Sequence, residues 1–126
     1  MIRFLVVALG GAVGAMARYG LAGLMQERFK GAFPIGTLTV NVLGCFCIGF
    51  LWVAVEEHRA EIPDLWRLFA TVGLLGGLTT FSTFGLDSVS LWDMGEEGLA
   101  ILSVAANLCL GFGAVFAARV LAHAIL

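Results

Sequence analysis

Residues 68–86 contain no charged residue, a run about as long as the 20 residues that an α-helix needs to cross a bilayer. The centre of this run suits an uninterrupted helix poorly, because glycine lowers helix propensity by about 1 kcal/mol and serine and threonine offer competing hydrogen bonds. The residues concerned are Gly73, Gly76, Gly77, Thr79, Thr80, Ser82 and Thr83. We therefore predict a membrane helix that breaks at residues 76–82. From spacing alone, a continuous helix that packs through Gly73 and Gly77 is an equal alternative.

A helix break at membrane depth is tolerated only where the freed backbone is buried in protein or lines a polar cavity. There, unpaired carbonyls can hold a cation, and unpaired N–H groups or hydroxyls can meet an anion. The hydroxyl residues that follow the glycines directly favour a break that handles ions.

The composition indicates a membrane protein. The chain is 60% hydrophobic and 13% charged, whereas soluble domains carry about 25% charged residues. Its net charge of −2 gives no basic patch, so nucleic acid is not an expected partner. Cys45, Cys47 and Cys109 all lie in apolar segments, where cysteine behaves as a small hydrophobic residue, and they predict neither a disulfide framework nor a zinc site.

The chain divides into four apolar segments, which we interpret as transmembrane helices of a single membrane domain over residues 1–126. The expected spans are residues 4–25, 33–55, 65–91 with the break near 76–82, and 98–118. The first span resembles a signal peptide up to Ala15-Met16-Ala17. Its apolar run continues past that point, so we interpret it as a membrane helix.

The charged side chains Arg18 and Asp87 lie within these spans. Arg18 lies inside the first span, where it either extends to the interface or supplies a fixed positive charge to an anion vestibule. Asp87 lies near the end of the third span, at a mouth or in a vestibule.

Polar residues four positions apart mark the second and fourth spans, and residues at this spacing share one helix face. Thr37 and Asn41 form one such pair. An amide in hydrocarbon must find a partner, so Asn41 either joins helices or lines a pore. Ser103 and Asn107 form the other pair, and Gly111 continues their stripe, which fits a pore lining or a buried seam.

The positive residues on the two sides of the membrane are nearly balanced. If the helices alternate in direction, one side carries Arg3, Arg59, Arg67 and Arg119, and the other carries Arg28 and Lys30, with Arg18 if it extends outward. A bias this weak permits insertion in both orientations, and hence an antiparallel homodimer.

These residues favour conduction over catalysis. No carboxylate lies deep in a span, and no histidine or cysteine has a suitable neighbour in sequence for acid–base or nucleophilic chemistry. A cation or proton carrier would use a buried Asp or Glu, whereas the deep polar groups here are amides and hydroxyls. Phe81 and Phe84 share a helix face, and the electropositive edges of their rings can meet an anion, with ordinary packing as the alternative. A small, hard anion suits this lining.

Three stretches resemble the signatures of the Fluc (CrcB) family of fluoride channels. They are Gly10-Gly11-x-x-Gly14-Ala15-x-x-Arg18-Tyr19, Gly36-Thr37-Leu38-x-Val40-Asn41-x-x-Gly44 and Gly76-Gly77-Leu78-Thr79-Thr80-Phe81-Ser82-Thr83-Phe84. They come in the family's order, the resemblance covers essentially the whole chain, and the third stretch is highly specific.

The resemblance implies an all-α membrane protein that forms an antiparallel, dual-topology homodimer, with two fluoride pores between protomers of four helices each. It implies that the backbone carbonyls of Gly76 and Thr79 from both protomers hold a structural sodium ion at the dimer interface. It further implies a multi-pass protein of the bacterial inner membrane that exports cytoplasmic fluoride passively and so lowers its toxicity.

The same resemblance assigns individual residues. The matching positions are, for the pore, Asn41, Phe81, Ser82, Thr83, Phe84, Ser103 and Asn107, and, for the vestibule, Arg18 and Asp87. Gly111 departs from the serine frequent in the family's polar track, and Asp87 stands where the family usually has glutamate. The amide, hydroxyls and ring edges would replace the water around fluoride, and a narrow pore would exclude chloride.

Two other functions remain open. A small multidrug-resistance type transporter also has four short helices, but its exchange of protons for cations needs a membrane-embedded glutamate that the first span lacks. A non-transporting assembly subunit would need only the packing motifs.

Overall fold

The computed structural model describes residues 1–57 and 62–126, with side chains described for all of these except residues 56 and 57. Its helices are α1 (Ile2–Arg28), α2 (Ile35–Trp52), the π-helix η1 (Val53–Glu57), α3 (Asp64–Leu68), the π-helix η2 (Phe69–Leu75), α4 (Gly76–Leu78), α5 (Phe81–Asp93) and α6 (Glu97–Ile125). Four stretches are long and apolar enough to cross a membrane: Ile2–Arg28, Ile35–Val55, Asp64–Asp93 and Glu97–Ile125. The prediction of an all-α chain with four long apolar helices is therefore confirmed. Arg59, which entered the charge comparison, lies outside the described residues.

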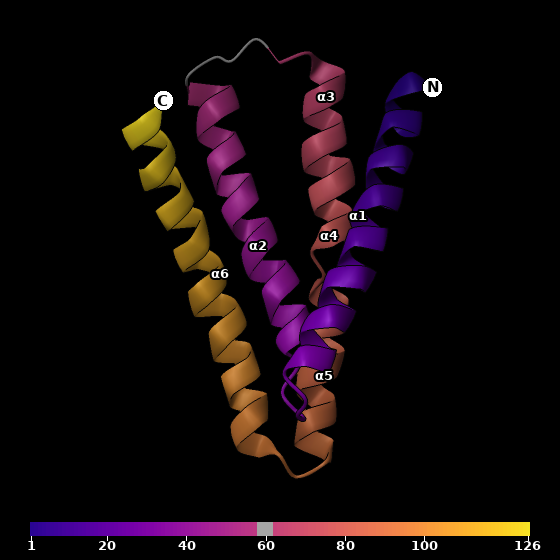
Figure 1. Ribbon diagram of the computed structural model, residues 1–126, viewed down its shortest axis with the longest axis vertical. Coiled ribbons are helices and arrows are strands. Elements are labelled where there is room, and N and C mark those ends of the chain that lie inside the picture. The colour runs from indigo at the N-terminus through magenta and orange to yellow at the C-terminus, as the bar shows by residue number, and fades with distance from the viewer. Residues whose placement is uncertain (58–61) are drawn as a thin grey trace.

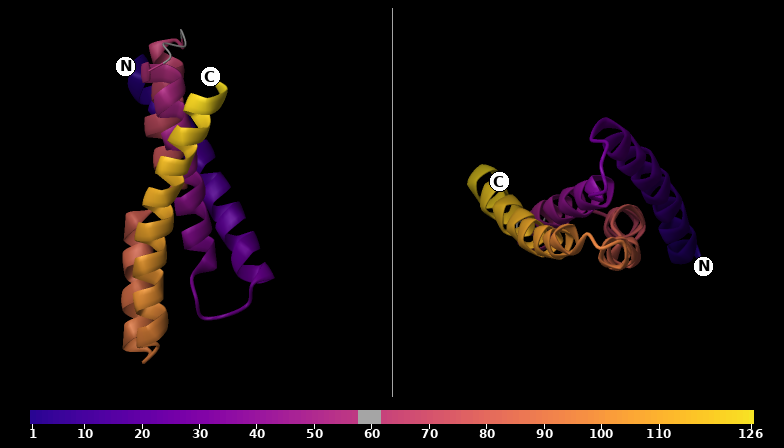
Figure 2. Two further views of the ribbon diagram at one scale, coloured as in Figure 1. Left: turned by 90° about the vertical axis from the view of Figure 1, so that its left-hand side faces the viewer. Right: turned by 90° about the horizontal axis from the view of Figure 1, so that it is seen from below.

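The helices form an open bundle whose two termini lie at the same end (Figure 1). Helix α2 packs against α6 and α1, α1 packs along η2 and α4, and α5 packs on α6. The α1–α2 loop and the α5–α6 pair stand well apart at the opposite end of the bundle (Figure 2). The helices therefore diverge toward that end.

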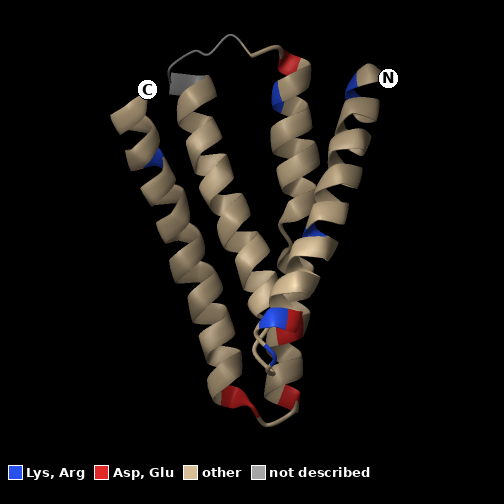
Figure 3. Ribbon diagram, in the orientation of Figure 1, with Lys and Arg blue, Asp and Glu red and all other residues tan. Residues whose placement is uncertain are grey.

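Little apolar surface is buried within one chain. Val40, Leu75 and Leu78 form the buried hydrophobic cluster, whereas large side chains such as Phe112 and Phe116 are exposed. Charged residues lie mostly toward the helix ends, with long apolar stretches between them (Figure 3). Such a surface suits lipid or another apolar chain.

Helix α1 crosses η2 and α4 with glycine facing glycine. A Cβ atom added at Gly10 would lie 2.6 Å from the Phe69 carbonyl oxygen, and one added at Gly77 would lie 2.7 Å from the Gly11 carbonyl oxygen. A Cβ at Gly14 would overlap the Leu74 carbonyl. The backbones therefore touch with no room for any side chain, which is the close approach that small residues allow between membrane helices.

Helix α4 ends at Leu78 and α5 begins at Phe81. The backbone of the two residues between them is extended, with φ −84° and ψ 157° at Thr79 and φ −152° and ψ 121° at Thr80. Gly76 is still helical, so the extended segment is shorter than the glycine and hydroxyl pattern alone suggests. We call these two residues the interruption.

Candidate functional site

The interruption is held by the side-chain amide of Asn41 on α2. Asn41 Nδ2 donates to the Thr80 carbonyl at 3.1 Å, and Asn41 Oδ1 accepts from the Thr80 amide at 2.8 Å. One side chain thus pairs with both backbone groups of one residue, as a neighbouring β-strand would. Because Thr80 is buried and its backbone has left the helix, this pairing satisfies groups that would otherwise be costly to bury.

Asn107 on α6 extends this pairing into a chain of amides. Its Oδ1 accepts from Asn41 Nδ2 at 3.0 Å, and its Nδ2 donates to the Ser103 carbonyl at 2.9 Å. Both hydrogens of Asn41 Nδ2 are therefore engaged, one by Thr80 and one by Asn107. An anion can receive a hydrogen bond from Asn41 only if it displaces one of these two acceptors. We call Asn41, Thr80 and Asn107 together the polar partition.

The start of α5 carries the hydroxyl residues that the sequence singles out. Thr80 Oγ1 accepts from the Thr83 amide at 3.1 Å and donates to Thr83 Oγ1 at 3.1 Å. Thr80 is thus the N-cap of α5, a role that threonine fills readily. Ser82 Oγ lies 3.4 Å from Thr80 Oγ1, and both Ser82 and Thr83 are exposed. Their hydroxyls can therefore turn toward an ion beside the interruption.

Phe81 and Phe84 pack edge to face, with ring centroids 5.5 Å apart and ring planes at 71°. Phe84 is buried, whereas Phe81 is 81% exposed. Both rings line a cavity together with Asn41 and Asn107. The edge hydrogens of Phe81 are therefore open to a neighbouring molecule or ion, and ring edges carry the positive end of the aromatic quadrupole.

Ser103 does not line this cavity. It is fully buried, and its Oγ lies 2.9 Å from Ser88 Oγ, which in turn donates to the Phe84 carbonyl at 2.8 Å. These two hydroxyls link α6 to α5. Ser88 is not among the residues predicted from the sequence, although its place four residues after Phe84 puts its hydroxyl within reach of that carbonyl. A Cβ atom at Gly111 would lie 3.5 Å from Cys45 Sγ, an ordinary contact.

Arg18 and Asp87 line a second cavity, between α1, α2 and α5, together with Thr37 and Thr80. Arg18 Nη1 donates to the Thr79 carbonyl at 3.4 Å, a long contact. The Asp87 carboxylate accepts from the Thr37 hydroxyl at 2.7 Å. This cavity therefore holds a positive charge next to the interruption and a carboxylate that a hydroxyl fixes in place.

Thr80 is the member of the polar partition at which the two cavities meet. The cavity that contains Phe81 and Phe84, which we call the central cavity, has a volume of about 390 Å³. The cavity that contains Arg18 and Asp87 has a volume of about 720 Å³. Thr80 lines both. Thr80, which the Asn41 amide holds, therefore lies at the boundary between the two cavities.

The interruption also frees two backbone carbonyls from helical bonding. In a continuous helix the Gly76 carbonyl would accept from the Thr80 amide, but that amide donates to Asn41. The Thr79 carbonyl would accept from the Thr83 amide, but that amide donates to the Thr80 hydroxyl. Hard cations take oxygen ligands, so these carbonyls suit a sodium ion, although two ligands from one chain are too few to enclose it. Among the described residues, no cluster of His, Cys, Asp and Glu side chains could hold a metal.

The sequence matches the family model described as "CrcB-like protein, Camphor Resistance (CrcB)" over residues 5–119. A protein of Saccharophagus degradans named "Fluoride-specific ion channel FluC" is 46% identical over 122 residues, which cover 96% of this chain and 90% of that protein. A protein of the same name from Nitratidesulfovibrio vulgaris is 43% identical, with 88% of this chain and 89% of that protein covered. A third, from Parabacteroides distasonis, is 41% identical, with 100% and 97% covered.

Proposed function

The chain belongs to the family of CrcB-like proteins, and from this membership we infer that it is a fluoride-specific ion channel and not an enzyme. The relatives that bear this name match it over almost the whole of both chains. The polar partition is the observation that best supports a fluoride path through this chain. Its residue Thr80 lines both cavities, and its amides and hydroxyl can donate hydrogen bonds to an anion.

Fluoride exchanges its water for protein donors at the polar partition. Burying a small anion is very costly unless hydrogen bonds replace its hydration. As the ion enters from the central cavity, it takes the Asn41 hydrogen that Asn107 otherwise accepts, and the hydroxyls of Ser82 and Thr83 turn toward it. The exposed edges of Phe81 complete the lining. Chloride is excluded because the passage is narrow and its donors are closely placed.

Arg18 and Asp87 belong to the vestibule on the other side of the partition. The positive charge of Arg18 next to the interruption raises the local fluoride concentration there. The Thr37 hydroxyl donates to the Asp87 carboxylate, which therefore keeps one orientation as fluoride passes.

The complete channel is an antiparallel homodimer. Phe81 is 81% exposed beside the central cavity, so a second copy is needed to close that cavity against lipid. The near balance of basic residues across the membrane supports insertion in both orientations. The protein acts in the bacterial inner membrane, where it exports cytoplasmic fluoride down its gradient and so lowers its toxicity.

A sodium ion fits between two such copies. The Gly76 and Thr79 carbonyls of both chains would hold it, and it would fasten the two interruptions to each other. Arg18 contacts the Thr79 carbonyl at 3.4 Å, and a carbonyl has a second lone pair for the cation.

The path is tested by Asn41→Leu, which keeps the side-chain volume and removes the amide. This change removes the donor that the ion would use. It also leaves two buried backbone groups of Thr80 without partners, at about 1–3 kcal/mol each. We therefore expect fluoride efflux from liposomes to fall at least tenfold. Thr39→Val is the matched control on the same helix, since the Thr39 hydroxyl donates to the Ile35 carbonyl of its own helix.

Asn41→Asp keeps the acceptor for the Thr80 amide, replaces the donor by a carboxylate oxygen and, when ionised, adds a negative charge that repels fluoride. It should fold and conduct poorly. Folded Asn41→Leu and Asn41→Asp proteins that conduct fluoride as fast as Thr39→Val would contradict this path.

A further inference from the structure

The hydrogen bond between Ser88 and Ser103 joins α5 to α6 one helical turn away from the central cavity. Ser88 follows Phe84 by four residues, and Ser103 precedes Asn107 by four. Phe84 and Asn107 both line the central cavity, one from each helix, whereas the two serines do not. We call Ser88 and Ser103 the serine pair.

The serine pair connects the backbone of Phe84 to the amide of Asn107. The Phe84 carbonyl can only accept, so the Ser88 hydroxyl donates to it at 2.8 Å. The Ser88 oxygen then accepts from the Ser103 hydroxyl, 2.9 Å away. The Ser103 carbonyl in turn accepts from Asn107 Nδ2 at 2.9 Å. A chain of hydrogen bonds, continued through the backbone of Ser103, therefore links the two residues that face the cavity.

The serine pair lies in apolar surroundings. Ser103 is fully buried and Ser88 is 8% exposed. Ser88 also lines an apolar cavity between α5 and α6, together with Ile101 and Val104. In such surroundings an unpaired hydroxyl is costly, and a hydrogen bond is electrostatically stronger than in water. We therefore expect the pair to hold the two helices at a fixed spacing.

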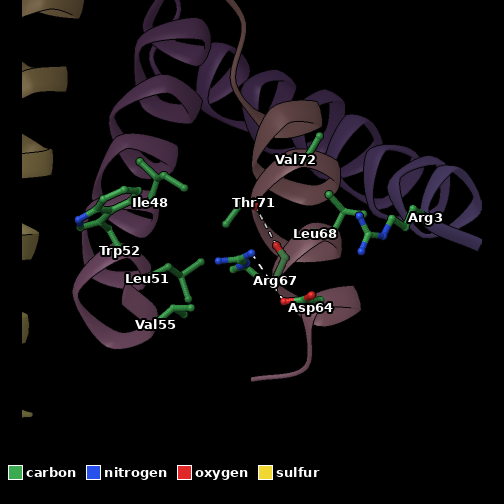
Figure 4. Close-up of a pocket in the computed structure, with 10 residues that line it drawn as sticks. All are labelled: Arg3, Ile48, Leu51, Trp52, Val55, Asp64, Arg67, Leu68, Thr71 and Val72. Carbon is green, nitrogen blue, oxygen red and sulfur yellow. Dashed lines mark hydrogen bonds and ion pairs between the residues drawn. The ribbon is translucent and has the colours of Figure 1, made fainter. Parts of the chain in front are cut away.

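The central cavity has a second boundary, on the side of η2, that the serine pair does not reach. Ile48 and Thr71 also line a third cavity, of about 430 Å³, between α2 and the α3–η2 segment (Figure 4). Neither residue of the serine pair is among the described residues that line it. A change in the pair should therefore alter the wall that α5 and α6 form and leave the boundary in Figure 4 as it is.

We propose that Ser88 and Ser103 are positioning residues for fluoride selectivity. The pair fixes the Phe84 ring relative to the Asn107 amide, and so limits the size of the anion that the Asn41 amide can reach between them. The proposal rests on the proposed fluoride conduction, and neither serine contacts the ion. If the wall yields, chloride, the larger anion, gains space, while the donors approach fluoride less closely.

The test is the ratio of the initial rates of fluoride and chloride efflux from liposomes that contain Ser88→Ala, Ser103→Ala or the double variant. Alanine favours helix, so each change removes the hydroxyl without weakening its own helix. We expect each single variant to lower the ratio about fivefold, the factor that one hydrogen bond contributes to an equilibrium. The double variant should match the single ones, because all three lack the same interhelical bond.

Ser90→Ala is the matched control. It removes a hydroxyl from the same helix, at a position that does not line the central cavity, and should leave the ratio unchanged.

The ratio separates positioning from stability, because a purely structural role would reduce the amount of folded channel and slow both ions by the same factor. An unchanged ratio in the folded variants, or effects that add in the double variant, would contradict the role of the serine pair. Failure of both single variants to fold would assign the pair to stability alone. Absence of fluoride efflux from the unmodified, folded chain would contradict the proposed function, whereas selective efflux from every variant would contradict the positioning role only.

Discussion

Thr80 combines a backbone pairing with a helix cap. Its amide and carbonyl pair with Asn41, and its hydroxyl accepts from the Thr83 amide at 3.1 Å to begin α5. The same side chain lines the cavities on both sides of the polar partition. A change at this one position therefore affects the start of α5 and the path together.

Replacing Thr80 separates the hydroxyl from the shape of the side chain. Thr80→Val keeps the shape but removes the cap, so we expect a loss of about 1 kcal/mol in the free energy of unfolding and a marked loss of fluoride efflux. Thr80→Ser keeps the hydroxyl and should conduct within a factor of about three of the unmodified chain. Thermal unfolding in detergent and liposome efflux measure the two effects. Equal behaviour of the two variants would contradict the role of the hydroxyl.

Single residues also show what the sequence can and cannot predict. An amide in an apolar segment must find a partner, so the need for a contact at Asn41 was predictable. Its partners were not, because Thr80 and Asn107 are 39 and 66 positions away in sequence. For the same reason no pattern revealed that Ser103 would bond to Ser88.

At the scale of elements, the crossing of α1 over η2 and α4 positions the interruption. Glycines on both sides bring the backbones into contact, and Arg18, one turn beyond Gly14, then reaches the Thr79 carbonyl. The small-residue face of α1 could be predicted from its sequence. The π-helix η2 could not, because its bonding pattern leaves no periodicity that distinguishes it from an α-helix.

Two glycines of α1 provide a matched test of this crossing. A Cβ at Gly14 would overlap the Leu74 carbonyl, whereas one at Gly20 would meet nothing within 4 Å. We expect Gly14→Ala to lower the free energy of unfolding by about 1–3 kcal/mol through overpacking. Gly20→Ala should be neutral or should stabilise by up to about 1 kcal/mol, since alanine favours helix. Thermal unfolding in detergent compares them, and equal stability of the two variants would show that the backbones can separate without cost.

At the interruption, tertiary contacts determine how many residues leave the helix. Glycines and hydroxyl residues mark residues 76–82 as a weak stretch of helix, yet only Thr79 and Thr80 are extended. Asn41 pairs with the backbone of Thr80 alone, and the Thr80 hydroxyl caps α5, which begins at the next residue. The length of the extended segment therefore depends on α2, which the local sequence does not reveal.

At the scale of the whole molecule, the membrane determines what the sequence can predict. Four apolar helices follow from composition and from the length that a bilayer requires. Their pairing does not follow, because an apolar face has the same composition whether it meets lipid or another helix. The exposed Phe81 ring beside the central cavity supports a second copy in the proposed channel.

Selective fluoride conduction by this molecule is tested most directly by ion efflux from liposomes that contain the purified, folded protein and are loaded with fluoride and chloride together. We expect rapid fluoride release that carries charge, needs no nucleotide and leaves the chloride inside. Retention of fluoride by folded protein, or release of chloride at the same rate as fluoride, would contradict it.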